Sequence, residues 1–585
     1  MKHALKIFLV SLVLVLAIHG IALATVITVP GDRPTIQLGL NAAQQGDTVL
    51  VAPGAYYEVV FWPATNGIKL LSEAGAESTT INGGNLSTVI YFPGLGGIDT
   101  TTVLRGFRIT NGGSVSYGGG IYLTQSSPII EQCIVDSNNA GGGIYCNNSS
   151  KPIIRSCSIS QNSGGGIVFN TSSGGTVDSC LIFDNGDFGI KANALQSNPI
   201  ISNSTVKNNG RGIYLRPWSP GFPRTSPMII NCIIRDNSIG IECDFSGDYS
   251  YDVGPTITGC LILRNSYGIF FFFLSYALIS NTIVTENASG GIHCENHSWV
   301  NPVPTITNCT ITRNSAPQGG GIYSFMGSPI IKHCTISDNR ASDTGDGIYT
   351  TYASWPTLDS NNICYNGYGV YNNDNSQLLS AANQWWGDAS GPYHPNYNPG
   401  GQGDSVNYFV YPLPYLTEAD TIAPPIPPVG LDTIAVGNDS ISLIWHASPI
   451  GDLAGYKVYF KSDSSGFPYS DTINVGLDTS VTILGLTTGT IYYIAVTCYD
   501  NSGNESWYSR EIHATPGGTM LRGDANGDGK INSADVSYLI NYLFVGGPAP
   551  QPWQAGDANC DGKINSADVT YLINYLFVGG PAPGC

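Results

Sequence analysis

The sequence has little positive charge and, after its first residues, no long hydrophobic run. Of its 585 residues, 24 are Lys or Arg and 42 are Asp or Glu, so the formal net charge at pH 7 is −18. A chain that binds nucleic acid needs a basic face for the phosphates, and this charge balance argues against one. The most apolar stretch after residue 24 is 268–274, which is far shorter than the roughly 20 residues of a membrane-spanning helix. We therefore expect neither a nucleic-acid partner nor a membrane span.

The first residues have the pattern of a secretory signal peptide. Lys2, His3 and Lys6 precede an apolar run from residue 7 to residue 18, and Ala-Leu-Ala at 22–24 supplies the small residues of a cleavage site. Polar, strand-like sequence follows. The pattern predicts a signal peptide over residues 1–24 and a secreted protein that is extracellular or associated with a cell surface.

Glycine followed by Ile or Val recurs every 22–30 residues. The glycines of this repeat are Gly120, Gly143, Gly166, Gly189, Gly212, Gly240, Gly268, Gly291, Gly321, Gly347 and Gly369. A second pattern, usually Cys-x-Ile-x-x-Asn, runs in phase with it. Short β-branched segments at such a period predict a solenoid of stacked coils, and a leucine-rich repeat is excluded because leucine is not the repeated residue.

The in-phase asparagines predict a ladder inside one turn of the solenoid, because stacked coils place the same turn position one above another. They are Asn138, Asn162, Asn185, Asn209, Asn237, Asn265, Asn287, Asn314, Asn339 and Asn366. Cysteines also stack in register. One repeat position holds Cys133, Cys157, Cys180, Cys232, Cys260, Cys309 and Cys334, and another holds Cys146, Cys243 and Cys294. Disulfides are the usual state in exported proteins, but this register predicts buried, reduced thiols that act as small apolar side chains.

These repeats resemble the right-handed parallel β-helix family, and the resemblance extends to the ends of the solenoid. Residues 34–43 and 46–49 are similar to the capping helix and first strand of that family, and 383–387 with 390–392 are similar to its C-terminal cap. The resemblance covers residues 25–416 and implies a mainly β fold. It leaves the function open, because the family includes pectate lyases, polygalacturonases, epimerases and non-catalytic surface proteins.

The residue after each Gly-Ile or Gly-Val pair should point outward, because side chains alternate along a strand. Coil by coil these residues are Tyr122, Tyr145, Val168, Lys191, Tyr214, Glu242, Phe270, His293, Tyr323, Tyr349 and Tyr371. The tyrosines and Phe270 are candidates for carbohydrate binding, because sugar C–H faces pack on aromatic rings. Cross-strand stacking that stabilises an exposed sheet is an equally open explanation.

Insertions locate a candidate catalytic region beside this stripe, because sites are built on loops of rigid scaffolds. They occupy 215–227, 244–255 and 295–304. The candidate catalytic residues there are Lys191, Arg216, Glu242, Asp244 and His293. Paired carboxylates would suit glycoside hydrolysis. An Arg or Lys base with calcium-bound carboxylates would suit uronate elimination, as in pectate lyases of this fold. The sequence has no polygalacturonase-like Asn-Thr-Asp, Asp-Asp or Gly-His-Gly, so a non-catalytic adhesin stays open beside a lyase or a hydrolase.

Residues 420–516 form a segment of a different type. Alternating strands are expected at 440–445, 456–460 and 492–496, with a Trp in an early strand and a Tyr before a late one. This pattern resembles a fibronectin type III β-sandwich, and its expected role is that of a spacer.

The last 64 residues contain one calcium-loop pattern twice. Oxygen-bearing side chains stand at loop positions 1, 3, 5, 9 and 12, glycine stands at position 6, and position 7 would contribute its carbonyl oxygen to a calcium ion. The predicted ligands are Asp524, Asn526, Asp528, Lys530, Asn532 and Asp535 in the first loop, and Asp557, Asn559, Asp561, Lys563, Asn565 and Asp568 in the second. Each loop runs into one amphipathic helix, so two bound calcium ions are expected.

A loop followed by one helix, duplicated, resembles the type I dockerin module. The resemblance covers residues 519–585 and implies binding to a cohesin domain on a scaffold or cell surface. In that family, loop positions 10 and 11 contact the partner, and here they are Ser533 and Ala534, with Ser566 and Ala567 in the second copy. A calcium-stabilised terminal domain without a partner is the alternative. Cys560 and Cys585 lie in this module and could clasp it. We thus expect a β-helix, a β-sandwich and a small helical domain, in a protein whose β-helix binds or cleaves an extracellular polysaccharide.

Overall fold

The computed structural model describes residues 24–94, 97–113, 118–139, 141–193, 197–216, 226–244, 254–272, 276–296, 303–437, 439–517 and 521–584. The expected signal peptide, apart from residue 24, and most of the three insertions lie outside these residues. The chain divides into two compact units. The first runs to residue 305 and includes 314–330 and 350–356, and the second contains 306–313, 331–349 and 357–585.

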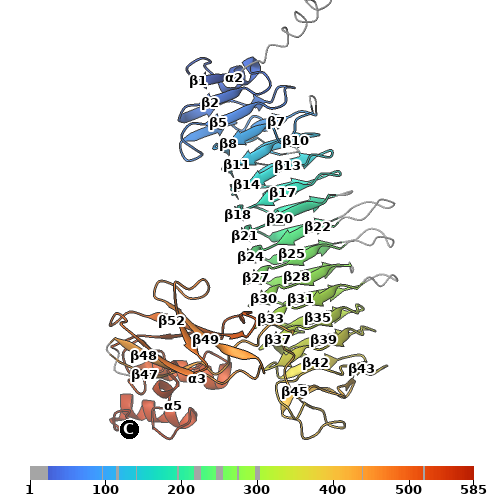
Figure 1. The fold of residues 1–585 in the computed structure, drawn as a ribbon. Coiled ribbons are helices and arrows are strands. Elements are labelled where there is room, and N and C mark those ends of the chain that lie inside the picture. Colours follow the sequence, from blue (N-terminus) through green and yellow to red (C-terminus); the bar gives the residue numbers. More distant parts are fainter. Residues whose placement is uncertain are drawn as a thin grey trace, which may run out of the picture. The chain divides into compact units, whose positions relative to one another are not determined.

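The first unit is a solenoid of parallel strands, with three strands in each coil (Figure 1). Sheet A contains β1 (Val26–Val29), β2 (Thr48–Val51), β5 (Lys69–Ser72), β8 (Val103–Arg105), β11 (Ile129–Glu131), β14 (Ile153–Arg155), β17 (Gly175–Asp178), β20 (Pro199–Ser202), β23 (Met228–Ile230), β26 (Thr256–Thr258) and β29 (Leu278–Ser280). Sheet B contains β3 (Gly54–Tyr57), β6 (Thr79–Asn82), β9 (Arg108–Thr110), β12 (Ile134–Asp136), β15 (Ser158–Ser160), β18 (Leu181–Phe183), β21 (Thr205–Lys207), β24 (Ile233–Arg235), β27 (Leu261–Leu263) and β30 (Ile283–Thr285).

Sheet C follows the recurring glycine in most coils and carries the outward residues identified from the sequence. It contains β4 (Val60–Phe61), β7 (Ile90–Phe92), β10 (Ile121–Thr124), β13 (Ile144–Asn147), β16 (Ile167–Phe169), β19 (Phe188–Asn193), β22 (Arg211–Arg216), β25 (Ile239–Asp244), β28 (Tyr267–Phe272), β31 (Ile292–Glu295) and β35 (Ile322–Phe325). The isoleucine after each glycine is fully buried, as in Ile190 and Ile213, so the predicted alternation is correct. The parallel β-solenoid predicted from the repeats is therefore confirmed.

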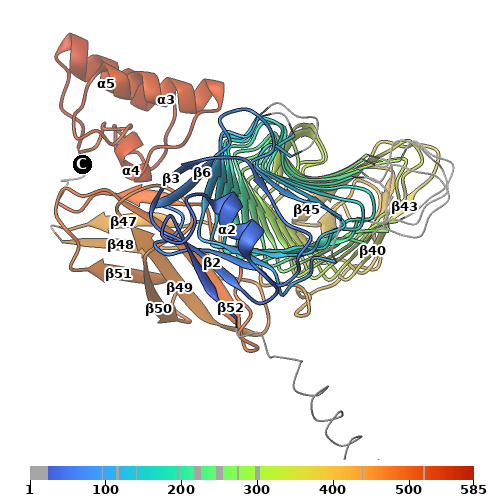
Figure 2. The same cartoon turned by 90° about the horizontal axis from the view of Figure 1, so that it is seen from above.

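A short helix covers the first coils, as Figure 2 shows. Helix α2 (Ile36–Ala42) is capped by the Thr35 hydroxyl, and the Glu58 carboxylate accepts hydrogen bonds from the backbone N–H groups of Ile36 and Gln37, both at 2.9 Å. The helix buries Ile36 and Leu40. The cap therefore lies where the sequence predicted it, although strand β1 precedes it and the strand expected at 46–49 starts at Thr48.

The predicted asparagine ladder occupies the turn between sheets B and C. Each side-chain amide donates to the side-chain oxygen of the asparagine one coil later, at 3.0 Å from Asn138 to Asn162 and 2.8 Å from Asn287 to Asn314. The ladder asparagines are at most 5% exposed. In the second unit, Asn339 donates to Asn366 at 3.1 Å, and Asn366 donates to Asp404 at 2.8 Å. The ladder satisfies polar groups that burial would otherwise leave without partners.

The cysteines are confirmed as free, buried thiols, but they are not simply apolar fillers. Cys157 Sγ donates to the Arg155 carbonyl at 3.3 Å, and other cysteines at this repeat position make the same contact. Where the repeat position holds another residue, Ser204 and Thr282 donate to the equivalent carbonyls at 2.7 and 2.9 Å. In these coils the position therefore holds a small side chain that donates a hydrogen bond, whereas an earlier coil has the buried Phe107 there.

The second unit contains the last strands of the repeat. These are β33 (Thr310–Thr312), β37 (Thr335–Ser337) and β41 (Asn362–Cys364) in one sheet, β36 (Ile330–Lys332) and β40 (Thr357–Asp359) in another, and β42 (Tyr368–Asn372), β45 (Gly403–Val406) and β44 (Pro392–Tyr393) in the third. The second unit also contains β38 (Arg340–Thr344) and the pair of β43 (Leu379–Ser380) with β46 (Val410–Tyr411), whereas β34 (Ser315–Gln318) belongs to the first unit. Two more strands are β32 (Thr305–Thr307) and β39 (Ile348–Thr351).

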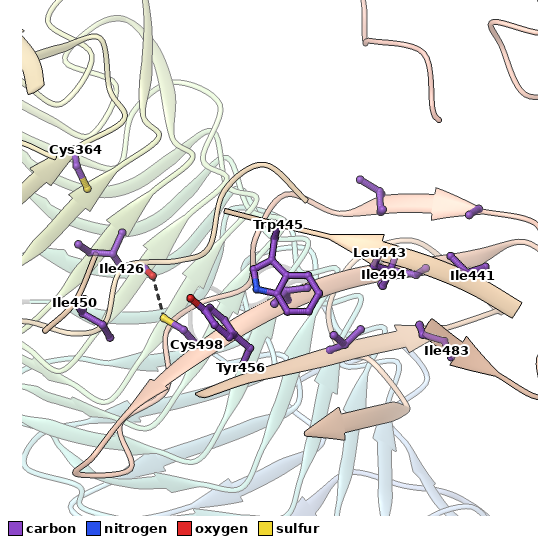
Figure 3. Packing of buried hydrophobic residues seen from close by; sticks show 14 of the residues in the cluster. Cys364, Ile426, Ile441, Leu443, Trp445, Ile450, Tyr456, Ile483, Ile494 and Cys498 are labelled. Carbon is purple, nitrogen blue, oxygen red and sulfur yellow. Dashed lines mark hydrogen bonds between the residues drawn. The ribbon is translucent and has the colours of Figure 1, made fainter. Parts of the chain in front are cut away.

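An antiparallel β-sandwich follows in the second unit. Its two sheets contain β47 (Asp432–Val436), β48 (Ser440–Ile444) and β51 (Ser480–Leu484), and β50 (Asp471–Gly476), β49 (Leu453–Lys461), β52 (Tyr492–Asp500) and β53 (Ile512–Ala514). Trp445 and Tyr456 meet edge to face in its core at 5.6 Å (Figure 3). The sandwich expected from the sequence is therefore present.

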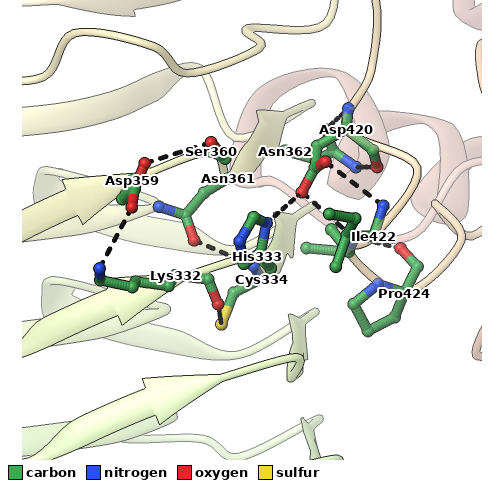
Figure 4. A network of polar contacts seen from close by, with 12 residues as sticks. Lys332, His333, Cys334, Asp359, Ser360, Asn361, Asn362, Asp420, Ile422 and Pro424 are labelled. Carbon is green, nitrogen blue, oxygen red and sulfur yellow. Dashed lines mark hydrogen bonds and ion pairs between the residues drawn. The ribbon is translucent and has the colours of Figure 1, made fainter.

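Polar contacts join the segment before the sandwich to the last coils (Figure 4). His333 Nδ1 lies 2.8 Å from the Asp420 carboxylate, and the Asn362 side chain exchanges two hydrogen bonds with the Asp420 backbone at 2.8 and 3.0 Å. Arg510 of the sandwich donates two hydrogen bonds to Asp338, at 2.6 and 2.7 Å. These contacts all lie within the second unit, and the role of the sandwich as a spacer stays a prediction.

The chain ends in a duplicated helical module. It contains α3 (Ser533–Val545), α4 (Trp553–Gly556), α5 (Ser566–Ile573) and the π-helical turn η1 (Asn574–Val578). The two longer helices bury Val536 and Leu539 against their counterparts Val569 and Leu572. Not all apolar side chains of the helices are buried. Ile540 and Phe544 of α3, Ile573 of α5 and Phe577 of η1 are exposed.

Candidate functional site

The outward residues of sheet C lie in the register that the sequence predicted, and we call them the outer stripe. Strand pairing aligns Tyr122, Tyr145, Val168, Lys191, Tyr214, Glu242, Phe270, His293 and Tyr323 in successive strands. The stripe starts earlier than expected, because Phe61 pairs with Tyr91 and Tyr91 pairs with Tyr122. Sequence reasoning missed these two rings because no Gly-Ile pair precedes them.

Rings near the two ends of this aligned stripe stack on one another. The ring centroids are 5.4 Å apart for Tyr91 and Tyr122, 4.6 Å for Phe270 and His293, and 4.3 Å for His293 and Tyr323. The interplanar angles are 8°, 7° and 10°. Because these ring faces are in contact, sugars passing along the surface would meet ring edges and polar atoms. The geometry here favours cross-strand stacking over sugar stacking.

Tyr349 and Tyr371, in the second unit, follow the same pattern. Their centroids are 5.9 Å apart at 8°, and Tyr349 is only 4% exposed. Tyr145 differs, because its ring is tilted by 41° against Tyr122 at 5.9 Å. Tyr145 also packs on an apolar cluster formed by Val168, Phe188 and Tyr214.

A charged region interrupts the aromatic stripe, and we call it the central patch. It lies on and next to β19, β22 and β25 and comprises Asp187, Lys191, Arg211, Tyr214, Arg216, Glu242 and Asp244. Four of the five candidate catalytic residues fall within it. The fifth, His293, lies outside and forms a hydrogen bond with Glu295 at 2.7 Å.

Lys191 is the cation of the central patch that has no acidic partner at ion-pair distance among the described residues. Its ammonium lies 5.2 Å from the centre of the Phe188 ring and 5.1 Å from that of Tyr214. Burial lowers the pKa of Lys191, Asp187 opposes this change, and the charges of Arg216 and Arg211 add to it. A half-buried ammonium resting on two rings is suited to bind a ligand oxygen.

Arg211 joins the two ends of the patch. Its guanidinium pairs with Asp187 and Glu242 and lies 4.6 Å from the centre of the Tyr214 ring. Burial raises the pKa of Glu242, and the charge of Arg211 opposes this rise. Glu242 is thus a half-buried carboxylate held by an arginine that the sequence analysis did not select.

Tyr214 connects this ion pair to the next one. Its hydroxyl donates to the Asp244 carboxylate at 3.0 Å, and Arg216 Nε lies 3.5 Å from the same carboxylate. Burial, followed by the negative charge of Asp244, raises the pKa of Tyr214 to about 12. Tyr214 is only 5% exposed, so its hydroxyl positions Asp244 rather than presenting a free ring face.

The patch contains the groups for acid–base chemistry but holds them in paired form. Glu242 and Asp244 project from the same face of β25, two residues apart, which is roughly 7 Å between Cα atoms. Two carboxyl groups are the usual requirement for glycoside hydrolysis. Here an arginine holds Glu242, while Arg216 and Tyr214 contact Asp244. The arrangement is better suited to hydrogen bonding with a polar ligand than to immediate proton transfer.

Arg211 and Asp187 are the residues of the patch that the sequence analysis missed. Asp187 lies two residues and Arg211 one residue before the glycine of its coil, outside the Gly-Ile pattern. A row of asparagines was missed as well, in which Asn170 donates to Asn147 at 3.2 Å and Asn193 donates to Asn170 at 3.3 Å. Most of the three insertions expected to border the stripe lies outside the described residues, namely 217–225, 245–253 and 297–302.

The two C-terminal loops are folded around their acidic side chains. Asp524 accepts hydrogen bonds from the backbone N–H groups of Asp528 and Gly529, at 3.0 and 2.8 Å. Asp535 accepts from the Asn526 N–H at 3.1 Å and also completes the capping box of α3. Asp557, Asp561, Gly562, Asn559 and Asp568 repeat this arrangement in the second loop.

The residues of each loop fit a hard cation. Burial raises the pKa of Asp524, and the negative charges of Asp535 and Asp528 raise it further. Burial together with Asp557 and Asp561 does the same to the pKa of Asp568. Within the described part of the chain, no group of three or more His, Cys, Asp or Glu side chains forms a complete metal cluster, so amide and backbone oxygens would have to complete the ligand set.

The residues expected to contact a partner are at the start of each helix. Ser533, Ala534, Ser566 and Ala567 are all exposed, and the Asn532 and Asn565 side chains cap the helices beside them. Cys560 is disulfide-bonded, and Cys585 lies outside the described residues. No helix in the described ranges is long and apolar enough to cross a membrane.

Comparison with family models gives three matches. The model of the right handed beta helix region matches residues 97–253 and 240–389, the fibronectin type III model matches 426–515, and the dockerin type I model matches 522–577. Dockerin type I domains bind calcium, and a dockerin implies a cohesin partner. Proteins that contain them are typically extracellular or located at the cell surface.

Three individual proteins are similar to this chain over short segments. A Kelch domain-containing protein of Saccharolobus solfataricus, SSO1033, is 34% identical over 83 residues, which are 14% of this chain and 11% of that protein. The chain thus spans about a tenth of the length of this curated relative. An Fn3-like protein from Clostridium thermocellum is 33% identical, with 16% of this chain and 92% of that chain covered and a TM-score of 0.14. The FN1–FN3 domains of chicken CNTN1 are 21% identical, over 16% and 32% of the two chains, with a TM-score of 0.15.

Proposed function

Because the chain belongs to the right-handed β-helix family and also carries a fibronectin type III domain and a type I dockerin domain, we propose that it is a secreted glycan-binding protein anchored through its dockerin. Its parts are a signal peptide (1–24), the β-helix with its caps (25–416), the sandwich (420–516) and the dockerin module (519–585). The β-helix binds an extracellular polysaccharide, and the dockerin binds a cohesin domain on a scaffold or cell surface.

The central patch is the observation that carries glycan binding. It combines the half-buried Lys191 ammonium, two arginines and two carboxylates on a rigid sheet, with Tyr145 and Phe188 beside them. Sugar hydroxyls both donate and accept hydrogen bonds, so a surface that offers closely spaced donors and acceptors suits them.

Calcium binding by both C-terminal loops supports the anchoring role. The ligands are the twelve loop residues named above, in which the carbonyl oxygens of Lys530 and Lys563 serve at position 7. A bound ion would neutralise the carboxylates that crowd each loop and would fix the start of α3 and α5. The partner then contacts Ser533, Ala534, Ser566 and Ala567, which are exposed beside the loops.

A screen of the full chain against acidic and neutral polysaccharides, with and without calcium, tests the β-helix proposal. Ultraviolet absorbance detects the unsaturated products of a lyase, and reducing ends without absorbance detect a hydrolase. The variant Lys191→Ala/Arg211→Ala should lose at least tenfold in glycan affinity, whereas Tyr91→Ala, outside the patch, should retain it. Unchanged affinity in the double variant would refute the patch as the binding site.

A second candidate function is that of a non-catalytic adhesin or structural surface protein. The stacking of Phe270, His293 and Tyr323 favours it, because these side chains serve the sheet itself. The ion pair between Arg211 and Glu242 also favours a non-catalytic protein. Retained glycan binding without products supports an adhesin that recognises glycans, and loss of both leaves anchoring as the function.

Anchoring is tested separately with a panel of type I cohesin domains in surface plasmon resonance. The full chain should bind a cohesin with calcium and lose binding with a chelator. The variant Asp528→Ala/Asp561→Ala should abolish binding while glycan affinity is unchanged. Binding that persists in the chelator contradicts a calcium-dependent anchor.

A further inference from the structure

The two calcium loops have nearly identical sequences but different surroundings. From Ile531 and Ile564 onward, the two copies differ at one residue over 20 positions, which predicts two equivalent halves. Before the loops the copies differ, because Arg522 stands two residues before Asp524 and Ala555 stands two residues before Asp557. The structure places this single arginine against the opposite loop.

Arg522 contacts the first ligand position of the second loop. Its Nη1 donates to the Asp557 carboxylate at 2.9 Å and to the Asp557 carbonyl at 2.8 Å. Both side chains are enclosed, because Arg522 is 17% and Asp557 is 2% exposed. An ion pair this well enclosed is screened little by solvent, and its hydrogen bonds fix the position of the carboxylate.

The first loop lacks this arrangement. Asp524 accepts hydrogen bonds from the N–H groups of Asp528 and Gly529, and no arginine or lysine lies at ion-pair distance from it among the described residues. Ala555, the counterpart of Arg522, is a buried methyl group and offers no charge. The three carboxylates of the first loop therefore face one another without an internal cation.

A second difference concerns loop position 4. The first loop has Gly527 there, with φ of 73°, and the second has Cys560, with φ of 63°. Left-handed backbone is favourable for glycine and unfavourable for most other residues. The cysteine adopts it and is disulfide-bonded. The second loop is thus held by a covalent link as well as by Arg522.

We propose that Arg522 acts as an internal cation for the second loop, so that the two calcium sites are unequal. The second loop keeps its shape without calcium and binds the ion more weakly, whereas the first loop depends on calcium for its shape and binds it more tightly. This inference rests on the calcium sites of the proposed function. Arg522 is a positioning residue, because it acts on the ion only through Asp557.

The physical reason is the sum of charges around each ion. Both loops offer three carboxylates and the same amide and carbonyl oxygens, but the second adds one positive charge on its first ligand. That charge repels a divalent cation. Calcium must therefore bind despite the repulsion, or the Arg522 guanidinium must move away from Asp557. The same charge holds the loop together beforehand, because it compensates the carboxylates that otherwise repel one another.

Calcium titration of the full chain by isothermal calorimetry tests the inequality. Asp561→Ala disables the second site, so that only the first site is titrated. Asp528→Ala disables the first site, so that only the second is titrated. We expect the second site to be at least tenfold weaker. Adding Arg522→Gln to Asp528→Ala should tighten the second site by about tenfold, and adding it to Asp561→Ala should change little. Arg522→Lys, which keeps the charge, should leave the second site weak.

The direction of the Arg522→Gln effect separates this role from a merely structural one. An arginine that only supports the fold would weaken calcium binding when it is removed, and that result overturns the proposal. Equal affinities at the two sites overturn it as well, while leaving calcium-dependent anchoring intact. Absence of calcium binding at both sites refutes the proposed function together with this inference.

Hydrogen exchange without calcium gives an independent measurement. The amides of α5 should be protected more strongly than those of α3, and Arg522→Gln should reduce the difference, leaving the part that the disulfide of Cys560 supplies. The control is Lys151→Gln, which removes an equal charge from an exposed residue outside the module. Equal protection of the two helices in the natural sequence contradicts the proposal.

Discussion

The Asn366 side chain donates to the Asp404 carboxylate at 2.8 Å, so the buried asparagine ladder ends on an acid. Asp404 is 9% exposed and also accepts the Asn366 backbone N–H. Burial raises the pKa of Asp404 to about 6, although its hydrogen bonds with Asn366 oppose this rise. The end of the ladder is therefore sensitive to pH in a range where the amides before it do not titrate.

The stability of the second unit should fall between pH 4 and pH 6.5. The pKa of Asp404 is higher in the folded chain than the 3.8 of a free side chain, so protonation favours the folded state. Its contribution is fully present below pH 3.8 and is lost as the pH rises through 6. A shift of two units corresponds to about 3 kcal/mol. Thermal unfolding across this range measures the change.

The control for this prediction is Asp404→Asn, which keeps an acceptor oxygen but does not titrate. The difference in free energy of unfolding between the natural chain and this variant should follow a single titration with a midpoint between pH 4 and pH 6. Parallel curves for the two proteins would show that Asp404 does not control the dependence.

Replacing one of the stacked cysteines should lower the free energy of unfolding by the contribution of the hydrogen bond that its thiol donates. Cys157→Ala removes the thiol hydrogen bond to the Arg155 carbonyl, which also accepts the Gln132 backbone N–H, and should lower the free energy of unfolding by about 1 kcal/mol. Cys157→Ser keeps a donor and should cost less, because Ser204 already occupies this position naturally. Chemical denaturation measures both, and equal losses would argue that only side-chain volume matters.

His293 should contribute to stability rather than to glycan binding. It stacks between Phe270 and Tyr323 and lies outside the central patch. His293→Ala should lower the free energy of unfolding by about 1 kcal/mol through lost stacking, with glycan affinity unchanged within twofold. Denaturation and glycan titration of the same preparation test this. A large loss of affinity would return His293 to the binding site.

Lys191 should react with amine reagents at a lower pH than an exposed lysine does, because burial lowers its pKa. Competitive acetylation with peptide mass spectrometry measures its rate relative to Lys151, which is exposed. A bound glycan should protect Lys191 and leave Lys151 unchanged. Equal protection of both lysines would indicate a general effect of the polysaccharide on the reagent.

Arg510 and Asp338 should show a modest coupling energy. Their two hydrogen bonds are short, but Arg510 is 55% exposed and solvent screens the pair. A double-mutant cycle with Arg510→Ala and Asp338→Ala should give about 0.5–1 kcal/mol, decreasing in high salt. A coupling of zero would mean that other contacts hold the sandwich to the last coils.

The repeat made the solenoid predictable from sequence. Gly189 with Ile190 and Gly212 with Ile213 recur in equivalent positions, so each coil confirms the register of the next. The asparagine ladder was predictable for the same reason. The N-terminal helix was predictable as well, whereas β1 before it carries no repeat signal and was missed.

The central patch was only partly predictable, because its contacts cross coils. Arg211 reaches Glu242, 31 residues later, and pairs with Asp187, 24 residues earlier. No short-range pattern in the sequence indicates ion pairs between residues so far apart. The orientation of His293 was also unpredictable, since alternation gives the face of a sheet but not the angle of a ring. The contact of Arg522 with Asp557 was not predictable from the duplication, because the second copy of the calcium loop has Ala555 at the position equivalent to Arg522.

The asparagine ladder also has a direction. Each amide gives its hydrogen to the coil that follows and offers its oxygen to the coil before, so Asn162 donates to Asn185 while accepting from Asn138. A coil copied from the middle would find the same donor above it and the same acceptor below it. Duplication or deletion of a single coil can therefore change the length of the solenoid without requiring a new hydrogen-bond partner for the ladder. Asp404 remains the residue at which the ladder ends, whatever the number of coils.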